Sequence, residues 1–436
     1  MNLKKHISEK TSFPYVYSYP PTRAYMPVSP KTVSTAIFSP RVNLYIHIPF
    51  CEQKCSFCGF LTTVDSRATS RDEYVTAVCQ EIERFAYHEQ LEISSVNFGG
   101  GTPMLLSEDQ VSKIMRQLNK SFSGLRKTAT EICMEATPES VTDSKIKNLK
   151  GLGFNRVSIG VQSFDASEIR LAKRHNLPAA TRNAIEIIRR HGIGNLCCDL
   201  MYGLQGQTIA SWQQTVSCLL EYMPETIELY RTVLIPDTGL FRIRDAAIMT
   251  PEEKYQAYEY ASQKLIAAGY IQDSHLRFTI PNRGFYQQQA NVFKGESLIG
   301  FGVAARTYAE NMHYRNSYGS NGRTAIARYI AAQTAGESAI DSAIILSEEE
   351  KLRRYLIYNL ESLDIEKIKN IYGCDIDKKF ESVWQLLKGQ GLIRLARGRI
   401  ELTEKASYFR DTIAAYFFSA DNASLENDYY KNINRD

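Results

Sequence analysis

The chain has 436 residues, of which 44% are hydrophobic, as in a globular protein with one large domain and a smaller one. Its formal net charge of +4 is small and the charged residues are interspersed, so charge gives no argument for a nucleic-acid partner. No apolar stretch reaches the roughly 20 residues that cross a bilayer, and no apolar signal core follows the first residues. We therefore expect a soluble, cytoplasmic protein with no membrane partner.

The first 41 residues are rich in Pro, Tyr, Ser and Thr, and they include the run Tyr-Ser-Tyr-Pro-Pro at residues 17–21. Such a composition is typical of a disordered tail. An ordered strap across the rest of the molecule is the alternative.

From residue 42 to about residue 233, short apolar runs alternate with polar turns and amphipathic stretches. This alternation predicts six β/α units with a parallel sheet and right-handed crossovers. The expected strands are residues 43–48, 94–98, 131–135, 156–161, 197–201 and 227–233. The expected helices are residues 71–88, 107–119, 143–152, 179–191 and 210–222. In such barrels the chemistry lies at the carboxyl ends of the strands.

Three cysteines follow the first expected strand with the spacing CxxxCxxC: Cys51, Cys55 and Cys58. The spacing fits three irons of a 4Fe-4S cluster and leaves the fourth iron open, whereas such clusters normally take four thiolates. A structural zinc site is the alternative, although zinc prefers paired C-x-x-C units or a set of four Cys and His ligands. The three-thiolate site resembles that of radical S-adenosylmethionine (SAM) enzymes, in which SAM chelates the open iron and is cleaved to a 5'-deoxyadenosyl radical.

The run Gly-Gly-Gly-Thr-Pro at residues 99–103 closes the second expected strand. Because glycine permits close backbone approach, this loop can offer N–H and C=O groups to the ammonium and carboxylate of SAM. A tight turn from strand to helix would also use glycine. The run favours a ligand site because it comes one strand after the cysteines.

Polar residues also end or interrupt the later strands. Glu135 could bind a ribose hydroxyl or an ammonium group, and a charge at a helix N-terminus is its alternative. Gln162 places an amide at the barrel mouth, where a strand-end hydrogen bond is the alternative. Asp199 lies in an otherwise apolar strand and needs a partner because burial of an unpaired charge is costly. A ligand hydroxyl or Arg174 could supply that partner, and a solvated helix face is the alternative for Arg174.

Towards the end of the chain, residues 347–360, 365–372 and 380–389 predict three short helices, and residues 392–402 follow with Arg-Gly at their centre. This order resembles a winged helix. A DNA-binding regulator would need a basic recognition helix, yet residues 380–389 carry one Lys against one Glu. We expect no nucleic-acid partner and a domain that acts as a lid on the barrel.

Together these motifs resemble the oxygen-independent coproporphyrinogen III oxidase family of radical SAM proteins over nearly the whole chain. The matching segments are residues 45–60, 97–103, 158–164, 199–203 and 298–303, with Glu135 and Arg174. The resemblance implies an α/β fold with a partial (β/α)6 TIM-like barrel. It implies an ordered N-terminal strap at residues 1–41, the barrel at 42–240, a barrel extension at 241–345 and a winged-helix-like lid at 346–436.

The same resemblance implies that two SAM molecules bind, one on the cluster and one beside it. The first SAM would contact Tyr45, Gly100 and Glu135, and Gly99 belongs to the same cofactor-binding loop. The second SAM would contact Phe57, Gly101, Thr102, Gln162, Arg174 and Asp199.

Two departures from the porphyrinogen-decarboxylating members affect the expected reaction. Those members carry a further cysteine two residues after the third ligand, where this chain has Phe60. Arg231 and Arg306 also stand near the SAM pair, where those members have small or apolar residues. We therefore expect methyl or methylene transfer from the second SAM to an sp2 carbon of an aromatic or conjugated substrate, as in class C radical SAM methyltransferases and cyclopropanases.

Two other functions stay open at this point. One is decarboxylation of propionate side chains, and the other is haem binding or trafficking without that chemistry. For an enzyme of this kind we expect a monomer that receives its electron from a donor such as flavodoxin or ferredoxin.

Overall fold

The computed structural model describes residues 15–64, 68–86, 91–122, 124–175, 177–243, 246–319 and 321–431. The predicted segments that extend beyond the described residues include the strap at 1–14, the first helix at 87–88 and the lid at 432–436.

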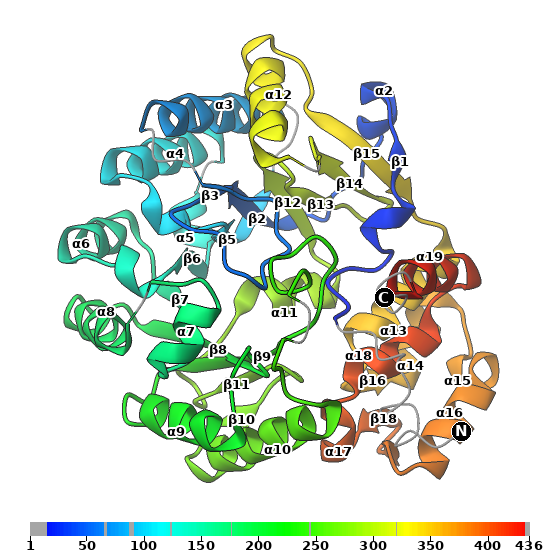
Figure 1. Ribbon diagram of the computed structural model, residues 1–436. Coiled ribbons are helices and arrows are strands. Elements are labelled where there is room, and N and C mark those ends of the chain that lie inside the picture. Colours follow the sequence, from blue (N-terminus) through cyan, green and yellow to red (C-terminus); the bar gives the residue numbers. More distant parts are fainter. Residues whose placement is uncertain are drawn as a thin grey trace.

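The predicted parallel sheet is confirmed, and its strands lie side by side in chain order. These strands are β2 (Arg41–Ile48), β5 (Glu92–Gly100), β6 (Glu131–Ala136), β7 (Arg156–Gln162), β8 (Asn195–Tyr202) and β9 (Thr226–Arg231). They are buried on both faces, which explains their nearly continuous apolar sequences. The sheet curves into a partial barrel (Figure 1).

The helices form the outer arc of that barrel (Figure 1). They are α3 (Ala68–Ala86), α4 (Glu108–Ser121), α6 (Asp143–Leu152), α8 (Pro178–Arg190), α9 (Ile209–Leu220) and α10 (Pro251–Ala267). The main apolar core lies between these helices and the strands and includes the fully buried Trp212 and Phe154. Helix α4 begins with a reciprocal cap between Ser107 and Gln110, and α6 ends at Gly153 in the left-handed region (φ 95°). Such caps satisfy the free backbone groups at helix ends and fix where each helix starts and stops.

Residues 241–345 do not form a single extension, because they add strands to both edges of the sheet. At one edge β12 (Ser297–Phe301) runs parallel to β2, and β13 (Arg306–Tyr308), β14 (Met312–Asn316), β15 (Ile340–Ile345) and β1 (Met26–Pro27) follow as antiparallel strands. At the other edge β11 (Arg277–Thr279) and β10 (Ile271–Gln272) follow β9. Four of these strands, β1, β10, β11 and β13, have only two or three residues, too few to show the alternation that predicts a strand.

Shorter elements complete the barrel region. They are η1 (Thr22–Ala24), α2 (Pro30–Val33), β3 (Phe50–Cys51), β4 (Thr63–Val64), η2 (Pro103–Leu105), α5 (Leu125–Thr128), η3 (Pro138–Ser140), α7 (Ala166–Leu171), α11 (Gln287–Lys294) and α12 (Gly322–Thr334). Across the described residues, none of the helices combines the length and the apolar composition needed to cross a bilayer.

The C-terminal domain has the predicted helices followed by a small wing, on the side opposite the arc of outer helices (Figure 1). Its elements are α13 (Glu348–Tyr358), β16 (Ser362–Asp364), α14 (Ile365–Tyr372), α15 (Ile376–Lys379), α16 (Glu381–Gly389), β17 (Ile393–Ala396), β18 (Arg399–Leu402), α17 (Glu404–Ser407), α18 (Arg410–Ala414), η4 (Ala415–Phe417) and α19 (Ala420–Lys431). The strand order is β16-β18-β17. Trp384, Leu387 and Phe417 lie in its apolar core.

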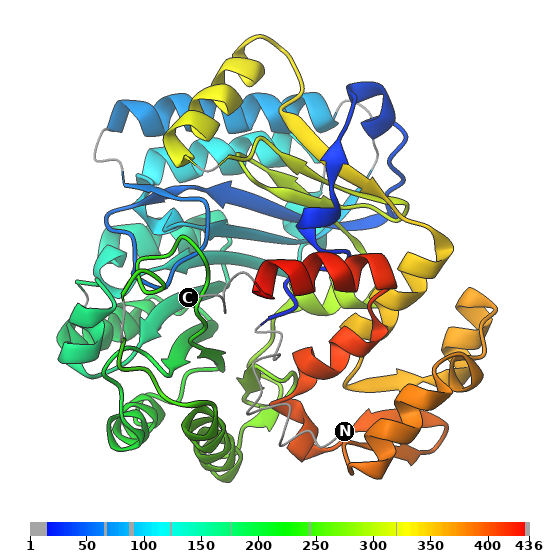
Figure 2. The ribbon, with the colours of Figure 1, turned by 45° about the vertical axis from the view of Figure 1, so that its right-hand side comes forward.

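The described part of the N-terminal segment packs against this domain. Tyr19 is fully buried in its core, its ring centroid lies 4.8 Å from that of Phe418, and its hydroxyl accepts a hydrogen bond from the Ser419 amide at 3.0 Å. Arg23 pairs with Glu426 of α19 at 2.6 Å. Figure 2 shows this dark blue segment beside the red α19. The segment is therefore held between barrel and C-terminal domain.

Candidate active site at the carboxyl ends of the strands

The three cysteines lie on a loop that leaves the barrel mouth after β2 and returns through β4. Cys51 ends β3, which pairs with β4. The amide of Ser56 donates to the Ala172 carbonyl at 2.9 Å, and the Ser56 carbonyl accepts from the Leu240 amide at 2.6 Å. All three cysteines are free thiols and are half-buried. The loop is thus fixed from two sides.

The glycine-rich loop after β5 packs directly onto the cysteine loop. A Cβ at Gly101 would lie 2.6 Å from the Phe50 carbonyl oxygen and 3.0 Å from the Cys51 sulfur. Gly100 adopts φ +113°, and a Cβ there would lie 2.5 Å from the His47 ring. Glycine is required at both positions because a side chain would collide with its neighbours. The two loops that the sequence predicted at neighbouring strand ends therefore meet.

The surroundings of the sulfurs fit thiolate ligands. The Thr102 hydroxyl donates to the Cys51 sulfur at 3.9 Å, and the Arg174 guanidinium donates to the Cys55 sulfur at 3.4 Å. Burial raises the pKa of Cys58 to about 11 and also raises the pKa of Cys51. Binding of iron at these thiols would therefore release protons.

The arrangement does not suit the zinc alternative. Among the described residues, no group of three or more His, Cys, Asp and Glu side chains converges on one metal position. A structural zinc ion needs four ligands around a single point, whereas the thiolates of a 4Fe-4S cluster hold different irons. The three cysteines thus fit the cluster better than they fit zinc.

Glu135 is placed where the sequence predicted it, on β6 beside the glycine-rich loop. Its carboxylate accepts hydrogen bonds from the Asn97 side chain and from the Gly100 amide, both at 3.2 Å. Burial raises its pKa. Tyr45 lies close by, and its hydroxyl is 3.2 Å from Nδ1 of His47. Glu135 therefore fixes the glycine-rich loop and does not cap a helix.

Sequence reasoning missed His47, which is buried at the end of β2. Burial lowers its pKa to about 4, so the ring is neutral. A histidine at the end of an apolar strand, directly before the cysteines, was the available signal.

Gln162 shows the features of a ligand-binding residue. It has a left-handed backbone (φ 67°) at an irregularity between β7 and β8. Its side chain is buried, and its Oε1 atom has no hydrogen-bond partner among the described residues. Left-handed backbone costs a non-glycine residue about 1–3 kcal/mol, and an unpaired buried oxygen adds to this cost. A ligand that donates to this oxygen would offset both.

Arg174 and Asp199 lie on either side of Gly160. Arg174 donates to the Gly160 carbonyl at 2.7 Å, and Gly160 is the register partner of Asp199. The Asp199 carboxylate accepts a hydrogen bond from the Ser158 hydroxyl at 3.2 Å. Burial, followed by the charge of Glu228, raises the pKa of Asp199 to about 8. The structure thus gives Asp199 a hydroxyl partner and places Arg174 against the cysteine loop, away from a solvated helix face.

A Cβ at Gly160 would lie 2.8 Å from Nε2 of Gln162 and 3.5 Å from the Arg174 guanidinium. The structure therefore places Gln162, Arg174 and Asp199 around Gly160. Phe57, the remaining residue of this predicted set, is half-buried between Cys55 and Cys58.

A cavity of about 520 Å³ opens next to the cysteine loop. This volume lies in the range of roughly 300–1,000 Å³ that is typical of small-molecule sites. Its described lining includes seven tyrosines and two phenylalanines. One of them, Phe60, is 54% exposed and makes an edge contact with Tyr17, with ring centroids 6.4 Å apart. Aromatic walls of this kind suit a large, flat, conjugated ligand.

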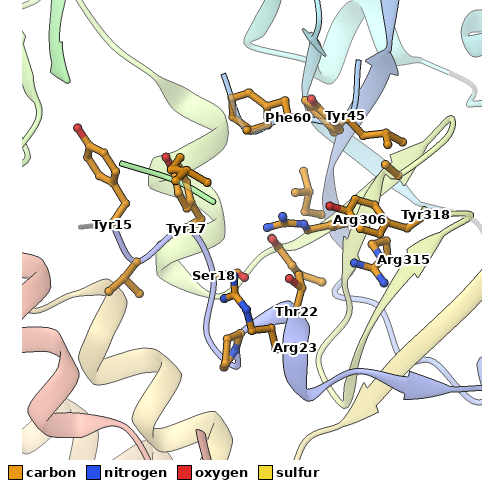
Figure 3. A pocket seen from close by; sticks show the side chains of 18 of the residues that line it. Tyr15, Tyr17, Ser18, Thr22, Arg23, Tyr45, Phe60, Arg306, Arg315 and Tyr318 are labelled. Carbon is orange, nitrogen blue, oxygen red and sulfur yellow. The ribbon is translucent and has the colours of Figure 1, made fainter. Parts of the chain in front are cut away.

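The two predicted arginines occupy different places. Arg306 begins β13 and lines the cavity (Figure 3). Arg231 ends β9, its guanidinium lies 5.4 Å from the ring centre of Tyr408, and its carbonyl accepts a 2.6 Å hydrogen bond from Tyr15. Tyr15 and Tyr408 both line a separate small pocket with Arg231. Among the described lining residues of the large cavity, Arg306 is present and Arg231 is not.

Sequence reasoning also missed Arg315, which lines the same cavity as Arg306. The two residues are equally distant from Glu310-Asn311, a polar pair between two short strands. A hairpin predicted at that pair would have placed the two arginines opposite each other.

The comparisons with known proteins agree with this geometry. A sequence model of the radical SAM superfamily matches residues 45–219. The chain is 28% identical over 397 residues to the oxygen-independent coproporphyrinogen III oxidase of Pseudomonas aeruginosa, covering 86% of this chain and 85% of that protein. It is 31% identical over 288 residues to the heme chaperone HemW of Synechocystis sp., covering 64% of this chain and 68% of that protein. The solved structure of coproporphyrinogen III oxidase (HemN) from Escherichia coli, a radical SAM enzyme, aligns with a TM-score of 0.81 at 25% identity, over 92% of this chain and 96% of that one.

Proposed function

This chain belongs to the radical SAM family that includes oxygen-independent coproporphyrinogen III oxidases and heme chaperones, and from this premise we propose that it transfers a one-carbon unit from SAM to a conjugated substrate. It is a radical SAM enzyme, and its cofactors are a 4Fe-4S cluster and SAM. The unit would be a methyl or methylene group, and the acceptor would be an sp2 carbon.

Cys51, Cys55 and Cys58 would hold the cluster. When bound, the cluster and its SAM supply a 5'-deoxyadenosyl radical that abstracts a hydrogen atom. The backbone groups of residues 99–102 and the Glu135 carboxylate would bind and orient the first SAM, with Tyr45 beside them.

A second SAM would lie where Gln162, Arg174 and Asp199 meet. The unpartnered Oε1 of Gln162 can accept a hydrogen bond from a ribose hydroxyl or an ammonium group. The Arg174 guanidinium can bind a carboxylate. The Asp199 carboxyl group can accept from a hydroxyl.

Phe60 is the observation that favours one-carbon transfer over decarboxylation. It stands where the decarboxylating members carry a further cysteine, and its ring lines the cavity. A phenyl ring can neither donate nor accept a proton or a hydrogen atom as a thiol can, so the extra thiol of those members has no equivalent here. The residues proposed for two SAM molecules are nevertheless present.

The substrate class follows from the cavity and from the names of the relatives, which act on coproporphyrinogen or handle heme. We infer a conjugated tetrapyrrole that contacts the aromatic walls described above. Haem binding without turnover of SAM is the second candidate, because the same walls would hold haem in a chaperone. In the enzyme, an electron donor such as flavodoxin or ferredoxin would reduce a monomeric protein.

The test is anaerobic incubation of reconstituted protein with SAM that carries a deuterated methyl group, a dithionite reductant and haem. We expect a product that gains a deuterated one-carbon unit, together with one deuterium atom in 5'-deoxyadenosine, both measured by mass spectrometry. A Cys55→Ala protein is the matched control and should give neither.

Two outcomes would contradict the proposal. Release of carbon dioxide from coproporphyrinogen III, with no labelled product, would show decarboxylation. Haem binding with no 5'-deoxyadenosine would show a chaperone.

A further inference from the structure

Two arginines stand directly opposite each other on the wall of the cavity. Arg306 of β13 is the register partner of Arg315 of β14, and both side chains line the cavity. Figure 3 shows them on the side of the cavity that faces Tyr15 and Tyr17 of the N-terminal segment. Like charges at directly opposed positions of an antiparallel pair destabilise a sheet. The pair therefore has a cost in folding that a function can explain.

The protein neutralises this pair only in part. The Nε atom of Arg315 lies 3.9 Å from the Asp341 carboxylate, and the guanidinium is 4.2 Å from the ring centre of Tyr318. No carboxylate of the described chain lies within salt-bridge distance of Arg306, whose polar neighbours include the hydroxyl groups of Tyr308 and Tyr25. The Nε atom of Arg315 is buried without a hydrogen-bond partner among the described residues. Both arginines are half-buried, so an anion that enters the cavity would complete the neutralisation of the pair.

A third arginine that lines the cavity, Arg23, has its charge neutralised by a carboxylate of the protein. Arg23 pairs with Glu426 at 2.6 Å and lies 3.3 Å from the ring centre of Tyr429. Glu426 is the single carboxylate among the described lining residues. The cavity thus has an excess of positive charge, and this excess lies on β13 and β14.

We propose that Arg306 and Arg315 form a clamp that binds the carboxylate groups of the substrate and places its conjugated system against Phe60 and Tyr17. The clamp rests on the proposed function, because it assumes a flat conjugated substrate in this cavity. Guanidinium groups bind carboxylates through two parallel hydrogen bonds, which fix the orientation of the ligand as well as its affinity. The clamp would select substrates with acidic side chains.

The test uses protoporphyrin IX, which has two carboxylates, and its dimethyl ester, which has none. Binding to the cluster-containing protein would be measured by anaerobic equilibrium dialysis. Arg306→Met should weaken binding of the acid about 10- to 100-fold, as expected for loss of a charged hydrogen bond. The same substitution should leave binding of the ester unchanged. Arg306→Lys should recover part of the affinity, because it keeps the charge and loses the two-pronged geometry.

Two further variants keep the test decisive if Arg306→Met folds poorly. Arg315→Met should lower the affinity for the acid in the same selective way. Arg394→Leu, on the exposed wing of the C-terminal domain, is the matched control and should change neither affinity. Equal binding of acid and ester by the wild type would overturn the clamp, and so would equal loss of both in the arginine variants.

The outcome also separates the clamp from the proposed reaction. Transfer of labelled carbon with no preference for the acid would disprove the clamp alone. Selective binding of the acid without labelled product would support the clamp and disprove one-carbon transfer.

Discussion

The cavity has two walls that differ in charge. On the barrel side, Tyr45 and His47 of β2 line the cavity, and both are neutral because burial raises the pKa of Tyr45 and lowers the pKa of His47 to about 4. On the side of the extension, Arg306 and Arg315 face each other, and the one carboxylate near the pair lies 3.9 Å from Arg315. The barrel wall is uncharged and lies beside the loops proposed to bind the cofactors. The wall of the extension is left unbalanced, as expected where a charged ligand completes the site.

This difference indicates which part of the molecule can change its substrate specificity within one family. The barrel wall lies beside the cysteine loop and the glycine-rich loop, which pack against each other, so a change in one loop disturbs the other. The wall of β13 and β14 depends on single side chains of short antiparallel strands. Substitutions there can change the substrate while the radical chemistry is kept.

The largest expected effect comes from the cysteines. Replacement of Cys51, Cys55 or Cys58 by Ala should abolish the visible absorbance of thiolate-bound iron and all cleavage of SAM, because each thiolate holds its own iron. If the two walls are independent, these proteins should still bind protoporphyrin IX more tightly than its ester. Cys374→Ala, in the C-terminal domain, is the control and should keep the full absorbance. An unchanged spectrum in the three cysteine variants would disprove the cluster assignment.

Gly101→Ala should disturb the cysteine loop almost as strongly as replacement of one of the cysteines. Its Cβ would lie 2.6 Å from the Phe50 carbonyl and 3.0 Å from the Cys51 sulfur, and overpacking of this kind costs about 1–3 kcal/mol. We expect Gly101→Ala to lower the iron content of reconstituted protein several-fold. Gly151→Ala in α6 is the matched control, since no atom lies within 4 Å of the added Cβ. Equal iron content in the two variants would show that the glycine-rich loop does not support the cysteine loop.

Asp199→Ala should affect the second SAM and spare the first. Loss of its hydrogen bond would leave a ligand hydroxyl unpaired at a buried position, which costs roughly 1–3 kcal/mol, so the stoichiometry of SAM binding should fall from two towards one in equilibrium dialysis. The cluster absorbance should stay intact, which distinguishes this variant from the cysteine variants. A wild-type stoichiometry of one would contradict the proposed second site.

The smallest expected effect is a pH dependence at the contact between the barrel and the C-terminal domain. His275 lies 3.5 Å from the Asp411 carboxylate and 3.6 Å from that of Glu361. Burial alone would lower the pKa of His275, but the two carboxylates outweigh burial and raise it. Because the pKa is raised in the folded state, the stabilisation is complete below the unfolded pKa of about 6.5 and is lost as pH rises through the folded pKa.

Thermal unfolding of the wild type and of His275→Asn between pH 5 and pH 9 measures this effect. The wild type should lose more stability than the variant as pH rises through the folded pKa of His275. Parallel pH profiles would show that folding does not raise the pKa of His275.

Sequence predicted most of the barrel because its signals are local. The helix expected at residues 143–152 has those bounds in the structure, since Thr142 caps its start and Gly153 ends it. The cysteine and glycine loops were predicted together because neighbouring parallel strands end at the same edge. Helix α7 was missed, as its six residues are too few to show a helical period.

The wall that carries the proposed clamp could not be predicted in the same way. Its strands have three and five residues, too few to show a clear alternation of apolar and polar residues. The different places of Arg231 and Arg306 depend on contacts such as that of Arg231 with Tyr408, which lies 177 positions later. No local pattern encodes a contact of that kind.

The ion pair between Arg23 and Glu426 joins residues that lie 403 positions apart in the sequence. Helix α19 is synthesised after every other described element. The residues that Tyr19 and Arg23 contact, among them Ser419 and Glu426, are therefore absent while most of the chain is being synthesised. During that time the N-terminal segment lacks the helix that Arg23 pairs with. Closure of this segment over the cavity therefore has to follow synthesis of α19.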